Sequence, residues 1–214
     1  MIVALCGAAR SGKDTVADLL SEFFPAGGTY RVQISGRAKA ICRDVFQWTM
    51  EHTDGALKDV PDERYPRPCA TCAGKGTIQV YLTHECPTCQ GKKVTYLTPR
   101  HAMQQLGGDF AEATFPAIWA FMAARTAMKL EANGLAIVTD CRFIRDLQAI
   151  KNVGGVIIQT HRKAEGLTGD AAKHQSEIER ESPEFQALVD HHIYNNGTLE
   201  DLRDRVRDLV LRLR

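Results

Sequence analysis

Residues 2–15 read IVALCGAARSGKDT, a short apolar run that leads directly into a glycine-rich turn. Residues 2–6 are apolar throughout, which is typical of a buried strand, and Gly7 marks the end of the run. Apolar side chains then recur at the spacing of one helix face, at Val16, Leu19, Leu20 and Phe23. The stretch therefore predicts a strand, a tight loop and a helix, in that order.

The loop of this unit has the composition of a phosphate-binding loop. Glycines at positions 7 and 12 let the backbone wrap around an anion, and the helix N-terminus adds positive potential. Lys13 stands where a lysine reaches the β and γ oxygens of a nucleoside triphosphate, and Asp14 or Thr15 offers an oxygen to Mg²⁺. The alternative is a glycine-rich turn with a surface lysine. The predicted ATP-binding residues are Gly7, Arg10, Ser11, Gly12, Lys13, Asp14 and Thr15.

The rest of the chain alternates between β-type and helix-type patterns. This order predicts parallel strands that are covered by helices on both faces. The expected class is α/β, with a three-layer P-loop NTPase fold and a parallel sheet of about five strands. The strand candidates are residues 2–6, 30–34, 135–138, 156–158 and 192–194. Helices are expected at residues 36–50, after Pro99, after Pro116 and after Thr198.

The composition is that of a folded globular protein. The 214 residues are 44% hydrophobic and 25% charged, which excludes the fibrous and disordered classes. Lysine and arginine number 27 against 26 acidic residues, so the net charge of +1 gives no general attraction for a polyanion. No apolar run approaches the ~20 residues that cross a bilayer. We expect a cytoplasmic protein, in the host cytoplasm if its source is viral, with no membrane partner.

Four of the seven cysteines form two CxxC pairs, Cys69 with Cys72 and Cys86 with Cys89, with 13 residues between the pairs. Each pair places two thiolates on one side of a glycine-containing turn, and four sulfurs complete a closed tetrahedral site. We expect a structural Zn²⁺, and four unbound thiols are the alternative. The composition changes around the cysteines, which predicts a zinc-ribbon-like insert at residues 64–94 within a kinase-like core of residues 1–63 and 95–214.

The insert has a second pattern beside the cysteine spacing. Residues 64–93 hold five lysines or arginines and one acidic residue, so nucleic-acid contact is an alternative that this small excess does not favour. The repeated CxxCxGxG resembles the zinc modules of J-domain co-chaperones, although Lys93 replaces the last glycine of the second copy.

Residues 10–18, RSGKDTVAD, resemble the phosphate loop of the phage-type deoxynucleoside monophosphate kinases, in which an aspartate after the lysine is normal. Further motifs match in family order and cover most of the chain outside the insert. They are Pro99-Arg100 with Gln104 and Gly107, Trp119, TDCRF at residues 139–143, Gly154-Gly155, HQSE at residues 174–177 and NNGTLEDL at residues 195–202. The resemblance implies transfer of the ATP γ-phosphate to a deoxynucleoside monophosphate, with Mg²⁺ as cofactor.

The resemblance also implies roles for individual residues. The acceptor side would carry Arg100, Gln104, Gly107 and Trp119, and the predicted catalytic residues are Lys13, Asp14, Asp140, Arg142 and Asp146. Arg37 and Lys39 follow a predicted strand end and are added as acceptor-binding candidates. His101, Gly108 and Asp146 stand where similar family members more often carry lysine, threonine and glutamate.

Several of these roles have a structural alternative. Asp140 ends a β run, where its carboxylate can approach Mg²⁺ or cap the next helix. Arg142 can clamp a phosphate or pair with Asp140, and Arg100 with Gln104 can form a solvated helix face. Trp119 lies in an apolar stripe that, without the resemblance, indicates core. Residues 161–182 are polar and are expected to close over the phosphates.

The expected function is a deoxynucleoside monophosphate kinase that converts ATP and a dNMP to ADP and a dNDP. Its partners would be ATP and the monophosphate, and a homodimer is left open. One alternative is a P-loop kinase of another small metabolite, because the loop specifies the donor and not the acceptor. The other is a zinc-bearing ATP-dependent switch that binds nucleic acid or protein.

Overall fold

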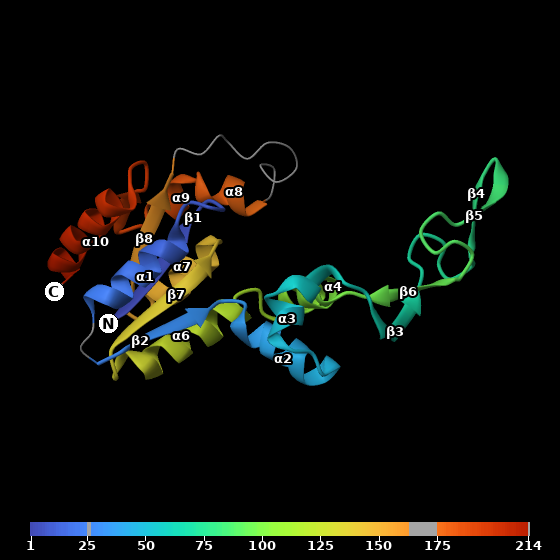
Figure 1. The fold of residues 1–214 in the computed structure, drawn as a ribbon, viewed down its shortest axis with the longest axis horizontal. Helices are drawn as coiled ribbons and strands as arrows, with labels where there is room; N and C mark the ends of the chain where they lie inside the picture. The colour runs from blue at the N-terminus through green and yellow to red at the C-terminus, as the bar shows by residue number, and fades with distance from the viewer. Residues whose placement is uncertain (25–26, 163–174, 214) are drawn as a thin grey trace. The chain divides into compact units, whose positions relative to one another are not determined.

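The computed structural model describes residues 1–24, 27–162 and 175–213 (Figure 1). The chain divides into two compact units, which are described separately below. The first comprises Met1–Arg37 and Phe115–Arg214, and the second comprises Ala38–Thr114. The chain passes from the first unit to the second after Arg37 and returns at Phe115.

The first unit is built on a five-stranded sheet in which all neighbouring strands are parallel. Its strands, in order across the sheet, are β2 (Thr29–Gln33), β7 (Leu135–Cys141), β1 (Ile2–Gly7), β8 (Val156–His161) and β9 (His191–Tyr194). β1 lies at the centre because its residues are apolar on both faces, and residues 2–6 are all buried. All five strand candidates are confirmed.

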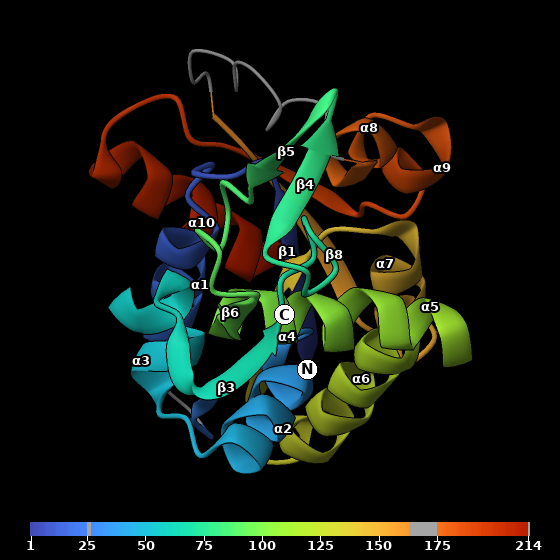
Figure 2. The same cartoon turned by 90° about the vertical axis from the view of Figure 1, so that its right-hand side faces the viewer.

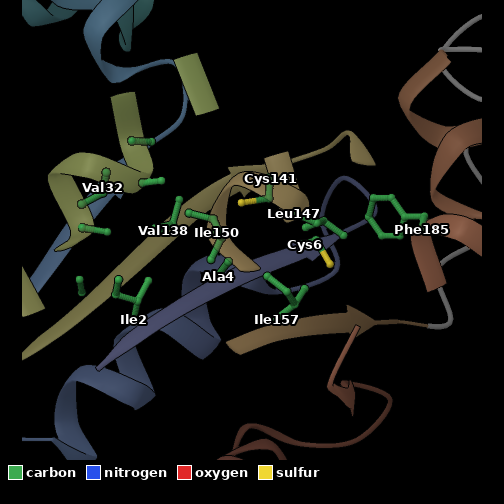
Figure 3. Close-up of a cluster of buried hydrophobic side chains, with 14 residues drawn as sticks. Ile2, Ala4, Cys6, Val32, Val138, Cys141, Leu147, Ile150, Ile157 and Phe185 are labelled. Atoms are coloured by element: carbon green, nitrogen blue, oxygen red, sulfur yellow. The ribbon is translucent and has the colours of Figure 1, made fainter. Parts of the chain in front are cut away.

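Helices cover both faces of this sheet, which confirms the three-layer α/β fold. One face packs against α1 (Lys13–Phe23) and α10 (Leu199–Leu213), with Leu20 and Val206 in their shared core. The other face packs against α6 (Ile118–Glu131), α7 (Ile144–Lys151) and α9 (Pro183–Gln186), the last of which follows α8 (Gln175–Arg180). Figure 3 shows this second core, in which Phe185 is fully buried. Such a side chain contributes about 1.5–3 kcal/mol to the stability of the unit.

The second unit contains short helices and two small antiparallel ladders (Figure 2). An aromatic group around the buried Trp48 holds it together: the partly buried Phe46 stacks on Trp48 with ring centroids 4.5 Å apart, and Tyr65 meets Phe46 edge-on at 5.1 Å. The helical elements are α2 (Gly36–Phe46), which begins in the first unit, α3 (Met50–Thr53), the 3₁₀ helix η1 (Ala56–Asp59), α4 (Pro99–Gln104), the π-helical turn η2 (Gln105–Phe110) and α5 (Ala111–Thr114).

The four-cysteine segment lies inside the second unit. β3 (Asp62–Pro68) pairs with β6 (Val94–Leu97) on either side of it, and β4 (Thr77–Val80) forms a hairpin with β5 (Leu82–Glu85) between the cysteine pairs. The hairpin agrees with the alternating apolar residues of this stretch. In the parts of the chain that the structure describes, no helix is long and apolar enough to cross a membrane.

Candidate functional site

The phosphate loop joins the end of β1 to the start of α1. Lys13 is the first residue of α1, and its Nζ turns back to donate to the carbonyl oxygens of Gly7 at 3.0 Å and Ala8 at 2.7 Å. These two acceptors are neutral, so the oxygens of a polyphosphate would form stronger, charge-assisted bonds in their place. The lysine is therefore held at the position where the loop can receive an anion.

Two contacts from other strands fix the shape of the loop. The Ser11 hydroxyl lies 2.6 Å from the Thr160 hydroxyl at the end of β8, and Asn195 Nδ2, just after β9, donates to the Ser11 carbonyl at 3.1 Å. The φ of Gly12 is 97°, a conformation that residues with a side chain rarely adopt. A Cβ here would also displace Asn195 Nδ2 from its bond to Ser11. Glycine is therefore favoured here by the backbone conformation.

Positive charge gathers around the loop. The pKa of Lys13 is lowered because the ammonium is partly buried and because the charges of Arg142 and Arg180 lie nearby, while Asp14 acts in the opposite direction. Cations that approach one another in a partly buried site are stabilised when an anion binds between them. The electrostatics thus suit a phosphate group.

The other predicted loop residues differ in exposure. Arg10 is exposed and has a φ of 62°, in the left-handed region. Asp14 is exposed and Thr15 half-buried, both in the first turn of α1. A carboxylate and a hydroxyl are hard oxygen donors of the kind that Mg²⁺ prefers, so these residues fit the expected cation.

Asp140 anchors a turn. Its Oδ1 accepts from the Ile34 amide at 2.7 Å, and its Oδ2 accepts from the Ser35 hydroxyl at 2.8 Å and the Ser35 amide at 3.4 Å. Its φ of 62° lies in the left-handed region, which is costly for a residue that carries a side chain. The carboxylate is thus directed to the turn between β2 and α2, and not to the helix that follows it in sequence.

Asp146 caps that following helix. It is only 4% exposed, and its Oδ2 accepts from the amides of Arg142 at 2.9 Å and Phe143 at 3.1 Å. Burial raises the pKa of Asp146 to about 6, although these backbone bonds oppose the shift. Asp146 therefore fixes the turn that carries Arg142, whose side chain is exposed.

Arg180 belongs to the same edge of the sheet, and the motifs of the sequence did not single it out. Its side chain is 14% exposed at the end of α8, and its charge acts on Lys13, on Cys6 at the end of β1 and on His161 at the end of β8. In the sequence, Arg180 is only one arginine within the polar stretch of residues 161–182. Thr160 was visible only as a strand-end residue, and Asn195 only as the first residue of the NNGTLEDL motif.

The acceptor candidates are divided between the two units. In the second unit, Arg100 forms a two-pronged bond to Asp59, and Lys39 Nζ lies 2.6 Å from Asp54 Oδ1. Gln104 is exposed at the end of α4, and Gly107 lies in the π-helical turn. In the first unit, Arg37 is exposed, and Trp119 is 9% exposed on the inward side of α6.

The second unit also contains an apolar cavity of about 560 Å³. Its walls come from α2, β3, β6, α4 and η2, and include Phe46, Tyr65, Leu106 and Phe110. On α4 the lining residues are His101 and Ala102, whereas Arg100 and Gln104 are not part of the wall. The predicted acceptor residues and this cavity therefore lie on different faces of one helix.

The four cysteines form a closed sulfur cluster. All four are buried, their sulfurs lie within 4.8 Å of one another, and the closest approaches are 3.8 Å for Cys69 with Cys86 and 3.7 Å for Cys72 with Cys89. A tetrahedron with Zn–S bonds of ~2.3 Å has sulfurs about 3.8 Å apart. The Gly76 amide also donates to Cys72 Sγ at 3.2 Å, as expected for a thiolate. The cluster therefore fits Zn²⁺.

The predicted catalytic residues thus lie in the first unit at the carboxyl ends of its strands, whereas four acceptor candidates, Lys39, Arg100, Gln104 and Gly107, lie in the second. The segment expected to close over the phosphates falls largely on residues 163–174, outside the described residues.

Comparisons with known proteins extend the picture. No family model matches the chain. A protein of Acanthamoeba polyphaga mimivirus named "Putative deoxynucleotide monophosphate kinase" is 24% identical over 216 residues, which cover 98% of this chain and 96% of that protein. Among solved structures, a dephospho-CoA kinase from Campylobacter jejuni has 15% identity and a TM-score of 0.49, covering 99% of this chain and 96% of its own. A shikimate kinase from Acinetobacter baumannii in complex with shikimate has 11% identity and a TM-score of 0.47. The match covers 100% of this chain and 94% of the shikimate kinase chain.

Proposed function

We propose that the chain is a phosphotransferase that moves the γ-phosphoryl group of ATP to a deoxynucleoside monophosphate, giving ADP and a dNDP. The observation that carries the proposal is the phosphate loop, closed around Lys13 and fixed by Thr160 and Asn195 at the carboxyl edge of a parallel sheet. The full-length similarity to the mimivirus protein supports the acceptor class.

The chemistry requires positioning more than proton transfer. The acceptor phosphate is already an anion, so little general-base help is needed, and the site has to neutralise charge as the phosphoryl group passes in line. Lys13 and Arg142 would supply that charge, with Asp146 holding the turn of Arg142. Asp14 or Thr15 would hold Mg²⁺, which would offset the charge of the phosphate oxygens.

Asp140 takes a supporting part in this proposal. Its bonds to Ile34 and Ser35 fix the start of α2, two residues before Arg37. It would thereby present Arg37 to the acceptor, while its own carboxylate stays at the edge of the sheet beside the phosphate loop.

The acceptor would be bound by the basic and amide residues of the second unit. Arg100 and Lys39 are each paired with a carboxylate, so a phosphate would have to replace Asp59 or Asp54 as the partner. Gln104 and Gly107 are the proposed contacts of the second unit with the base and sugar. Trp119, in the first unit, is kept as a separate acceptor-binding candidate.

The four-cysteine cluster would hold a structural Zn²⁺ that stabilises the insert at residues 64–94. All four coordination positions are taken by protein sulfurs, so no position is open for a substrate. The proposed setting is the cytoplasm, or the host cytoplasm for a viral source, and a homodimer would be compatible with the fold.

The direct test is to incubate the protein with ATP, Mg²⁺ and each ribo- and deoxyribonucleoside monophosphate, and to resolve the nucleotides by chromatography. Formation of diphosphate from deoxynucleoside monophosphates is expected. Slow ATP hydrolysis that is independent of the monophosphate would reject the proposal.

Lys13→Met is expected to lower transfer by about 100-fold or more, because its ammonium would no longer stabilise the migrating charge. The fold should be retained, since the Nζ bonds of Lys13 go only to neighbouring loop carbonyls. Lys151→Met, on the far end of α7 and paired with Asp190, is the control that should keep activity. Near wild-type turnover in Lys13→Met would contradict the assignment.

A second candidate function is a zinc-bearing switch that binds a macromolecule. The observation in its favour is the tip of the β4–β5 hairpin, where Tyr81 is fully exposed and Leu82 is 70% exposed. ATP hydrolysis that is stimulated by nucleic acid or an unfolded polypeptide, without transfer to a monophosphate, would favour it.

A further inference from the structure

We propose that Arg180 is a third phosphate-binding cation beside Lys13 and Arg142, and that Glu179 positions it by binding the N-terminus of α7. The inference rests on the proposed function for the identity of the anion, a nucleoside triphosphate. It assigns a role to the last two residues of α8, which lie beyond the HQSE motif at residues 174–177.

The contact that carries the inference joins α8 to α7. Glu179 Oε1 accepts a short hydrogen bond from the amide of Ile144, the first residue of α7. A helix N-terminus carries unsatisfied amides and positive potential, so a carboxylate there is stabilising. This carboxylate comes from a helix that lies 35 residues further along the chain.

The same N-terminus receives a second carboxylate from within α7. Asp146 accepts from the amides of Arg142 and Phe143, so the amides of three consecutive residues, 142 to 144, are all bound by acidic side chains. The turn that carries Arg142 is therefore fixed from α7 by Asp146 and from α8 by Glu179. Arg142 and Arg180 are thus positioned through one shared junction.

The other end of α8 is fixed as well. Gln186 Nε2, on α9, donates to the Arg180 carbonyl at 2.7 Å, and α9 is anchored by Phe185, which is fully buried in the core. The backbone of Arg180 is therefore tied to the hydrophobic core of the first unit. A rigid backbone lets a cation meet its anion with little loss of conformational entropy.

The charge environment agrees with this placement. Arg180 has Glu181 at 3.4 Å, but that carboxylate is 77% exposed and is screened by solvent, whereas the Arg180 side chain is 14% exposed. The Arg180 charge lowers the pKa values of Lys13 and His161, which places it near the ends of both β1 and β8. Three cations at one sheet edge repel one another until an anion lies between them.

The test uses four variants and one control variant, each compared with wild type for kcat, KM and the dissociation constant of ATP without acceptor. Arg180→Ala should lower kcat by about 100-fold or more and weaken ATP binding. Arg180→Lys should recover only part of this loss, because a lysine cannot form two parallel hydrogen bonds to a phosphate.

Glu179→Ala should lower kcat by about 10-fold. Glu179→Gln, which keeps an acceptor oxygen, should recover most of that loss. Glu184→Ala, in the exposed first turn of α9, is the matched control.

The readouts separate this inference from the proposed function. If wild type transfers phosphate to no monophosphate, the proposed function fails, but weaker ATP binding by Arg180→Ala would still support the third cation. If wild type transfers phosphate and Arg180→Ala matches it in kcat and ATP affinity, Arg180 has no such role. A Glu179→Ala variant with wild-type kcat, or a Glu179→Gln variant no better than Glu179→Ala, would overturn the positioning role.

Discussion

Asp146 gives the site a dependence on pH. Its pKa in the folded protein is about 6, above the unfolded value of about 3.9. Between these two values the unfolded chain has released a proton that the folded protein still holds, so the free energy of unfolding falls as the pH rises through this window. The stabilising contribution is full below about pH 4 and is lost above about pH 6, a change on the order of 2–3 kcal/mol.

Asp146→Asn should remove this dependence while keeping an oxygen that accepts from Arg142 and Phe143. Urea unfolding at about pH 4.5 and about pH 7 should show a smaller difference between the two pH values in the variant than in wild type. An equal difference in both proteins would show that the Asp146 carboxyl titrates as it does in the unfolded chain.

The contacts of an individual residue were predictable where its partners lie close to it in the sequence. Lys13 was predicted from the spacing of glycines after a strand, and in the structure its Nζ donates to the carbonyls of Gly7 and Ala8 in that loop. The partner of Asp140 is not local: the carboxylate bonds to Ile34 and Ser35, more than 100 residues away. Arg180 could not be found from the sequence, because α8 and the strand ends near it are distant in the sequence and come together only in the folded protein.

The two CxxC turns, at residues 69–76 and 86–93, repeat each other in backbone conformation. Positive φ angles occur at equivalent positions of both copies, at Ala73 and Gln90, Gly74 and Gly91, and Gly76 and Lys93. The hydroxyls of Thr71 and Thr88, also equivalent, lie 2.8 Å apart. Lys93 has a φ of 67°, so it adopts the left-handed conformation that Gly76 adopts at the equivalent position of the first copy.

Lys93→Gly should stabilise the zinc-loaded protein by about 0.5–1 kcal/mol, because left-handed strain is relieved by more than the added entropy of the unfolded chain. Lys92→Gly is the matched control and should destabilise slightly, since Lys92 is not one of the left-handed residues. Thermal unfolding of both variants with bound zinc gives the comparison. A lower stability of Lys93→Gly would show that the turn is not strained.

Whole helices and strands were predicted from the periodicity of apolar residues more reliably than the segments that adjoin them. The helix expected after Pro99 begins at that residue, but it continues through a π-helical turn at Gln105–Phe110 that no side-chain pattern announces. The β3–β6 ladder was missed because β3 contains two prolines and an irregular register, both of which weaken the strand pattern.

Removal of zinc should act on one part of the molecule. Among the residues whose burial the structure describes, Ile78 is the one partly buried apolar residue that packs against the cysteine cluster. The two cores of the sheet are formed by other residues. Chelation, or Cys72→Ser, should therefore open residues 64–93 to proteolysis and leave the five-stranded sheet folded. Limited proteolysis with mass spectrometry, and one zinc per chain by elemental analysis, would check this.

Cys42→Ser is the control for that experiment, because Cys42 lies with Trp48 and Ala102 and outside the sulfur cluster. It should keep the zinc. Unfolding of the whole chain on chelation would show instead that the metal supports both units.

At the scale of the molecule, the sheet was predictable because each strand is a compact apolar run. The compact second unit is Ala38–Thr114, wider than the insert of residues 64–94 that the change in composition indicated. The flanking helices have ordinary amphipathic composition, and what joins them to the insert is the packing of Phe46, Trp48 and Tyr65, which spacing alone does not reveal.

The pairing of the sheet has a consequence for the order of events during synthesis. β1 leaves the ribosome before its partner strands, because Ile2 pairs with Ala136 and Val3 pairs with Val156, which are made much later. The four cysteines, by contrast, span only residues 69 to 89. We therefore expect the four cysteines to bind metal on the nascent chain. At that stage the apolar β1 has not yet paired with β7 or β8, so it is accessible to chaperones and prone to aggregation.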